Sequence, residues 1–195
     1  MDTRQNEGCP PFDVTDLLRR IEQGSAPKYL LFWGHRAKGG NAIGKHVLSQ
    51  WWPCDFDVGD VRYGSAEHYM MAEKARMFGD ADAALRICKA ATPGAAKALG
   101  RAVKNFDQTR WDAGCFDIVV RGNAAKFGQS EALRLLETGD RVLVEASPVD
   151  RIWGIGLAAD DPRAESPAQW RGSNLLGFAL MKARAELRPR EGEVA

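Results

Sequence analysis

The chain has 195 residues, of which 45% are hydrophobic and 27% are charged, as expected for one globular domain with a substantial core. Its 27 Lys and Arg against 26 Asp and Glu give a net charge of +1, which excludes attraction of the whole molecule to nucleic acid but leaves room for a local basic groove. The four cysteines are too widely spaced for a CxxC pair, so neither a zinc site nor a disulfide framework is expected. Residues 1–10 are polar, and no apolar run approaches the ~18 residues of a membrane span. We therefore expect a cytoplasmic protein with no membrane partner, cofactor or metal.

The first third of the chain predicts a short helix, a strand and a hairpin. Asp13 or Thr15 can cap a helix that Gly24 ends. The apolar run KYLLFW at 28–33 indicates a buried strand. Residues 36–44 are expected to form a loop, and their glycines lack the spacing of a phosphate-binding loop. Apolar residues alternate over residues 56–61, which predicts a hairpin.

Residues 64–80, GSAEHYMMAEKARMFGD, predict a helix that combines a carboxylate and an amine. Ser65 is a good N-cap, so Glu67 takes the second helical position, where exposed amides and the helix dipole favour a carboxylate. Met71, Lys74 and Phe78 follow Glu67 on the same face. The spacing alone also fits a Glu that only compensates the dipole and a Lys that is only solvated.

The rest of the chain predicts further helices around one more strand. Asp80, Thr92–Pro93 and Asp107 each start a helix. Helices are expected over 81–90, 93–103, 108–127 and 130–136, a strand over 141–146, a turn-rich stretch over 147–156 and a polar loop over 157–167. Ser173 is expected to cap a final amphipathic helix that Pro189 ends.

Helices with few strands and no regular βαβ alternation predict an α+β fold. No repeat or linker divides the chain. We expect a leader with a short helix at 1–26, a single helix-rich domain with a small sheet at 27–188, and a charged disordered tail at 189–195.

Four segments occur in a fixed order: SQWWP (49–53), GSAEHYMMAEKA (64–75), EASPVDRIWGIG (145–156) and WRGSNLLG (170–177). With these segments, the chain from about residue 29 to 187 resembles the NADAR family, the YbiA-like N-glycosidases. The resemblance implies a YbiA-like fold and hydrolysis of an N-glycosidic bond to a phosphorylated ribose. Two substrate classes are implied: ribosylamino-pyrimidine phosphates of riboflavin biosynthesis, and ADP-ribose on guanine in DNA or nucleotides. A non-catalytic ADP-ribose- or nucleotide-binding module is the alternative from another class.

Three residues are candidates for the chemistry. Breaking an N-glycosidic bond develops positive charge on the ribose, which the Glu67 carboxylate could stabilise while activating water. Asp150, after the second strand, could orient water or hold ribose hydroxyls, or simply form an Asx-turn. Lys74 could contact phosphate, protonate the leaving base, or attack the anomeric carbon.

Substrate binding is assigned to aromatic and cationic side chains. Trp111 and Trp153 are the expected stacking faces for the base. Arg171 with Asn174, at a helix start, could clamp phosphate or ribose. Further candidates are Trp52, Trp170, Arg101 and Lys126, the last two equally well explained as solvated charges. Trp33 and Trp51 are interpreted as core, and His68 as a packed or capping residue. The basic residues expected to contact DNA, were DNA the substrate, are Arg163, Arg171 and Lys182.

Overall fold

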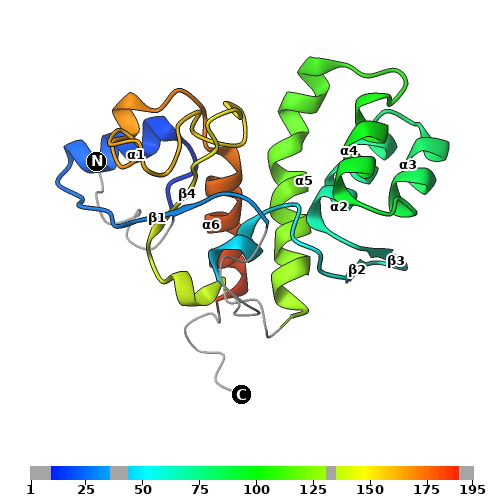
Figure 1. Cartoon of the computed structure of the whole chain (residues 1–195), viewed down its shortest axis with the longest axis horizontal. Coiled ribbons are helices and arrows are strands. Elements are labelled where there is room, and N and C mark those ends of the chain that lie inside the picture. Colours follow the sequence, from blue (N-terminus) through cyan, green and yellow to red (C-terminus); the bar gives the residue numbers. More distant parts are fainter. Residues whose placement is uncertain (1–9, 36–43, 131–134, 189–195) are drawn as a thin grey trace, which may run out of the picture. The chain divides into compact units, whose positions relative to one another are not determined.

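Helices dominate the computed structural model, which describes residues 10–35, 44–130 and 135–188 and in which the chain packs as two units (Figure 1). Unit 1 combines Met1–Phe32 with Leu136–Ala195, and unit 2 is Trp33–Leu135. The described part holds six α-helices and two two-stranded sheets, which confirms the α+β prediction. None of the described helices is both long and apolar enough to cross a membrane.

Unit 1 is built on two parallel strands that are distant in sequence. β1 (Tyr29–Phe32) pairs with β4 (Val142–Glu145) in a register that sets Tyr29 opposite Val142. Figure 1 shows α6 (Leu175–Leu187) beside β4, where a Cβ on Gly177 would stand 2.1 Å from the carbonyl oxygen of Leu143. Only glycine lets the helix approach the strand so closely. The first helix, α1 (Val14–Glu22), starts at Asp13, one of the two caps that the sequence predicted.

The other elements of unit 2 pack around the helix α2 (Ala66–Met77), which begins at the predicted cap Ser65. Eight of its twelve residues are buried. Two glycines make close packing possible: a Cβ on Gly100 would stand 2.2 Å from the sulfur of Met71, and one on Gly122 would stand 2.4 Å from the ring of Tyr69. The other elements are β2 (Phe56–Val58) and β3 (Val61–Tyr63), paired antiparallel as predicted, and the helices α3 (Ala81–Cys88), α4 (Pro93–Arg101) and α5 (Gln108–Gly128).

Three short 3₁₀ helices complete the described chain: η2 (Lys45–Leu48), η3 (Leu136–Thr138) and η4 (Pro167–Gln169). Residues 136–138, where the 130–136 helix was to end, form η3; residues 131–134 of that prediction lie outside the described residues. Most of the predicted 36–44 loop, the start of the leader and the tail also lie outside them.

Two predictions fail for physical reasons. Trp33 is 57% exposed, so its interpretation as core is wrong. Ser173 does not cap α6: the N-cap is Asn174, in the left-handed region at φ 51°, with no side-chain cap hydrogen bond. The amides of Leu175 and Leu176 donate instead to the carbonyl oxygens of Ile152 and Trp153, at 3.2 and 3.1 Å. Main-chain carbonyls thus satisfy the helix start, and no hydroxyl is required.

Candidate active site

Glu67 lies at the second position of α2, where its side chain is 2% exposed. Its Oε1 is 3.8 Å from the Nζ of Lys97 on α4, a half-buried side chain. The pair places a carboxylate in a largely dry environment with a cation at ion-pair distance. Such a carboxylate can face a developing positive charge, because little water screens it.

The segment before the hairpin is fastened beside Glu67 by main-chain contacts. The amide of Glu67 donates to the carbonyl oxygen of Gln50 at 3.0 Å. The Nζ of Lys126, a fully buried side chain, donates to the carbonyl oxygens of Val47 at 2.7 Å and Ser49 at 3.0 Å. Burial lowers the pKa of Lys126 to about 7. These contacts make Lys126 a residue that positions the 47–50 segment, rather than one that reaches solvent.

The same segment presents two half-buried tryptophans. The Nζ of Lys97 lies 5.7 Å from the ring centroid of Trp51, whose ring also packs against Gly94 at the start of α4. Trp52, a predicted binding residue, has its ring 4.6 Å from that of His46, tilted by 57°. Lys97 is therefore close to both Trp51 and Glu67, although nothing in the sequence distinguishes Trp51 from Trp52.

Lys74 contacts two aromatic rings further along α2. Its Nζ lies 4.1 Å from the ring centroid of Phe106 and 5.6 Å from that of Trp111. Burial lowers the pKa of Lys74. Trp111 is almost fully buried, and Lys74 already occupies part of its surroundings. Arg101, another predicted binding residue, is exposed at the last turn of α4.

Asp150 in unit 1 organises a turn. Its Oδ1 accepts hydrogen bonds from the amides of Ile152 at 2.9 Å and Trp153 at 2.8 Å, and its own amide donates to the hydroxyl of Ser147 at 3.2 Å. This is the Asx-turn geometry that the sequence left open beside a catalytic role. Trp153, predicted to stack on the base, follows in this turn and is half-buried.

Asn174 joins α6 to β4 with its whole amide. Its Nδ2 donates to the carbonyl oxygen of Leu143 and its Oδ1 accepts from the amide of Glu145, both at 2.9 Å. The side chain of Asn174 is fully buried and positions the start of the helix. Of the two residues predicted to clamp phosphate or ribose, only Arg171 is exposed. Trp170, half-buried, donates from Nε1 to the carbonyl oxygen of Ala164 at 2.8 Å and so fixes the adjoining loop.

His68 has both ring nitrogens engaged. Nδ1 lies 2.7 Å from the hydroxyl oxygen of Ser65, and Nε2 lies 3.0 Å from the carbonyl oxygen of Ala90. It joins the start of α2 to the end of α3, which matches the packed role expected of it. Within the described residues, no group of three or more His, Cys, Asp or Glu side chains has the arrangement of a metal site.

Sequence reasoning missed Lys97 and undervalued Trp51. Lys97 and Arg101 lie one turn apart on α4, and the sequence offered no means of choosing between them. The choice depends on how α4 packs against α2. Lys97 and Glu67 are thirty positions apart in the chain, but Nζ of Lys97 lies 3.8 Å from Oε1 of Glu67.

Comparisons with known proteins show the family of the chain. The model of the NADAR domain matches residues 31–188. An N-glycosidase of Acanthamoeba polyphaga mimivirus is 46% identical over 166 residues, covering 82% of this chain and 96% of that protein. An N-glycosidase of Nostoc punctiforme is 36% identical, covering 72% of this chain and 85% of that protein. A riboflavin biosynthesis protein of Vibrio vulnificus is 31% identical over 72% of this chain, although the match covers only 35% of that protein.

The fold has a counterpart among solved structures. The NMR structure of the E. coli protein YbiA aligns with a TM-score of 0.65 at 24% identity, covering 86% of this chain and 89% of that one. That likeness concerns the fold alone. The family model and the curated relatives together show that the protein belongs to the NADAR family and is a hydrolase of the N-glycosidase class.

Proposed function

We propose that the protein hydrolyses the N-glycosidic bond of phosphorylated ribosylamino-pyrimidines, intermediates of riboflavin biosynthesis, and releases ribose 5-phosphate and the free base. The observation that carries the proposal is the buried carboxylate of Glu67, with the ammonium of Lys97 at 3.8 Å and Trp51 beside it. The names of the relatives support both the proposed reaction and the proposed substrate class: two relatives are N-glycosidases, and one is a riboflavin biosynthesis protein.

In the proposed reaction, the bond between the anomeric carbon and the base nitrogen breaks and its electron pair leaves with the base. The ribose ring gains oxocarbenium character, which the negative charge of Glu67 stabilises. Water adds to the anomeric carbon, Glu67 accepts its proton, and that same proton then passes to the nitrogen of the departing base, which leaves Glu67 ionised again. Lys97 holds the Glu67 carboxylate in place, and its ammonium group can also bind a phosphate oxygen of the substrate.

The remaining residues divide between substrate contact and support. Within unit 2, we assign substrate contact to Lys74; the roles predicted for Trp153 and Arg171, which belong to unit 1, stay predictions. Asp150, Lys126 and Asn174 support loops and helix starts through the hydrogen bonds described above.

Incubation of the purified protein with each substrate class, followed by chromatography of the free base, tests the proposal. We expect release of pyrimidine from the ribosylamino-pyrimidine phosphate, and slower release of guanine or guanine nucleotide from ADP-ribosylated substrates. Faster turnover of ADP-ribosyl-guanine would make that the substrate instead. Binding of either compound without any release would show a nucleotide-binding module.

A further inference from the structure

A cavity of about 670 Å³ lies in unit 1, and no residue assigned to the glycosidase site lines it. Cavities that hold small ligands have volumes of roughly 300–1,000 Å³. The walls come from α1, α6, the segment before β1 and the start of β4. Their larger apolar side chains are Pro10, Pro11, Leu17, Pro27, Val142 and Met181.

The polar part of the lining is cationic. Five cations line the cavity, Arg20, Lys28, Arg141, Arg184 and Arg188, and among the described residues Asp140 is the one carboxylate of the lining. Within the same described ranges, two of these cations have carboxylate partners: Arg20 pairs with Asp16 at 2.9 Å and Arg188 with Asp140 at 2.7 Å. The charge of the lining therefore stays positive after these pairs are counted.

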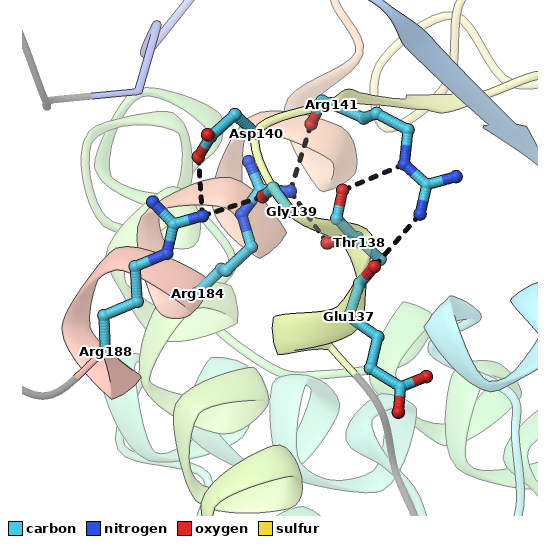
Figure 2. Close-up of polar contacts among 7 residues, drawn as sticks. All are labelled: Glu137, Thr138, Gly139, Asp140, Arg141, Arg184 and Arg188. Carbon is cyan, nitrogen blue, oxygen red and sulfur yellow. Dashed lines mark hydrogen bonds and ion pairs between the residues drawn. The ribbon is translucent and has the colours of Figure 1, made fainter.

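Arg141 and Arg184 are held by neutral oxygens of the described chain (Figure 2). Arg141 donates from Nε to the carbonyl oxygen of Thr138 at 2.9 Å and from Nη2 to that of Glu137 at 3.1 Å. Arg184 donates from Nη1 to the hydroxyl of Thr138 at 2.8 Å and to the carbonyl oxygen of Arg141 at 3.0 Å. These bonds orient both guanidinium groups without neutralising them.

Arg184 shows how strongly this arrangement favours an anion. The residue is 4% exposed, and burial, together with the guanidinium groups of Arg188 and Arg141, lowers its pKa to about 10. A buried cation near other cations is costly, and a bound anion would relieve that cost. Guanidinium groups match phosphate geometry well, because their fork can donate two parallel hydrogen bonds.

We propose that this cavity is a second ligand site, which binds a small phosphorylated molecule of the size of a nucleoside monophosphate. The phosphate lies against Arg141 and Arg184 at the 137–141 turn, and the apolar body lies against Leu17, Val142 and Met181. The site is separate from the proposed hydrolysis and does not depend on its substrate.

A methionine-methyl NMR titration of the full chain tests the site with AMP and with inorganic phosphate as probes. Met181 lines the cavity, whereas Met70, Met71 and Met77 lie on α2 in unit 2. We expect AMP to shift the Met181 methyl signal saturably and phosphate to do so more weakly. Arg141→Gln should weaken AMP binding about tenfold, since one charge-assisted contact is lost, and should leave hydrolysis at the wild-type rate.

Arg86→Gln is the matched control, because Arg86 is an exposed arginine of α3 in a loose pair with Asp82 at 3.8 Å; it should not change the AMP affinity. If Arg141→Gln alters the ligand-free methyl spectrum, Lys28→Gln at the exposed rim replaces it, with a several-fold loss of AMP affinity expected. An unmoved Met181 signal, shifts confined to the α2 methionines, or equal AMP affinity in the folded variants would each overturn the proposal.

Discussion

The two candidate carboxylates, Glu67 and Asp150, have different surroundings at the residue scale. Glu67 is 2% exposed with an ammonium group 3.8 Å away. Asp150 is half-buried, and its Oδ1 accepts hydrogen bonds from two amides of its own turn. A carboxylate committed to a turn has less freedom to follow charge that develops during a reaction, whereas a buried one acts with little screening. We therefore propose Glu67, and not Asp150, for the electrostatic role.

Glu67→Gln should lower kcat by roughly 10²–10³-fold, because the amide keeps the shape of the side chain but loses the charge that faces the cationic transition state. The thermal unfolding midpoint and the KM should change little. Steady-state kinetics and a melting curve measure both. Glu73→Gln, on the same helix in an ion pair with Arg76, is the control and should keep wild-type turnover. Normal turnover by folded Glu67→Gln would remove Glu67 from the mechanism.

Lys74 has a lowered pKa and lies over the rings of Phe106 and Trp111, so it can serve as a cation or as an amine. If it contacts phosphate, Lys74→Arg should keep at least about a tenth of the wild-type kcat/KM, because the positive charge remains. An amine nucleophile could not be replaced by arginine. Borohydride added during turnover, followed by mass spectrometry, distinguishes the two: we expect no sugar adduct on Lys74, and an adduct would establish the nucleophile.

At the scale of elements, the position of the site depends on how the 45–52 segment is held against α2 and α5. Lys126 on α5 reaches two carbonyl oxygens of that segment, and Gln50 accepts from the amide of Glu67. Trp51 and Trp52 follow within a few residues. A change at Lys126 is thus expected to act on the site through the backbone of 47–50.

Lys126 also predicts a pH dependence of stability. Its pKa is about 7 in the folded chain against an ordinary value of 10.5, so between these values the unfolded chain binds a proton that the folded chain does not. The free energy of unfolding therefore gains from Lys126 as pH rises through this window, and the gain is lost as pH falls to 7 and below.

Lys126→Met should remove this contribution and leave the carbonyl oxygens of Val47 and Ser49 without their donor, at a cost of about 1–3 kcal/mol. Urea unfolding at several pH values measures the difference between wild type and variant. We expect the wild type to gain on the variant as pH rises from about 7 to about 10. A difference that stays constant with pH would show that Lys126 does not titrate in this range.

For the whole molecule, the distribution of charge bears on the substrate. The net charge is +1, and one member of the basic cluster predicted for DNA, Arg163, is already bound to Asp161 through two hydrogen bonds between side chains, at 2.9 and 2.7 Å. Arg171 and Lys182 are exposed on the surface of unit 1. We therefore expect these cations to suit the one or two charges of a phosphorylated ribosylamine better than a polyanion.

Salt dependence checks this conclusion. On the small phosphorylated substrate, kcat/KM should fall only mildly between low and moderate salt, because few ionic contacts are made. On ADP-ribosylated DNA held along its backbone, it would fall by roughly tenfold or more. The two slopes are measured with the same enzyme preparation. A steep slope on DNA together with weak activity on the pyrimidine phosphate would reverse the choice of substrate.

The sequence by itself determined those features that depend on neighbouring residues. The caps Ser65, Asp80, Thr92 and Asp107 each accept a hydrogen bond from an amide three positions ahead, so residue identity and spacing were sufficient. The same local rule placed Glu67 in the first turn of its helix. The order of the helices, the hairpin and the α+β class followed from periodicity, which is also local.

Only the tertiary structure decided which distant residues meet. The parallel pairing of β1 with β4 joins segments more than one hundred residues apart, and the Glu67–Lys97 pair depends on two helices packing together. Ser173 was predicted as a cap, but the carbonyl oxygens of Ile152 and Trp153 are the acceptors at the start of α6. Asn174 was predicted as a substrate clamp, but its amide is hydrogen-bonded to β4. In each case the partner is far away in the chain, and burial compels polar groups to find whichever partner the fold brings near.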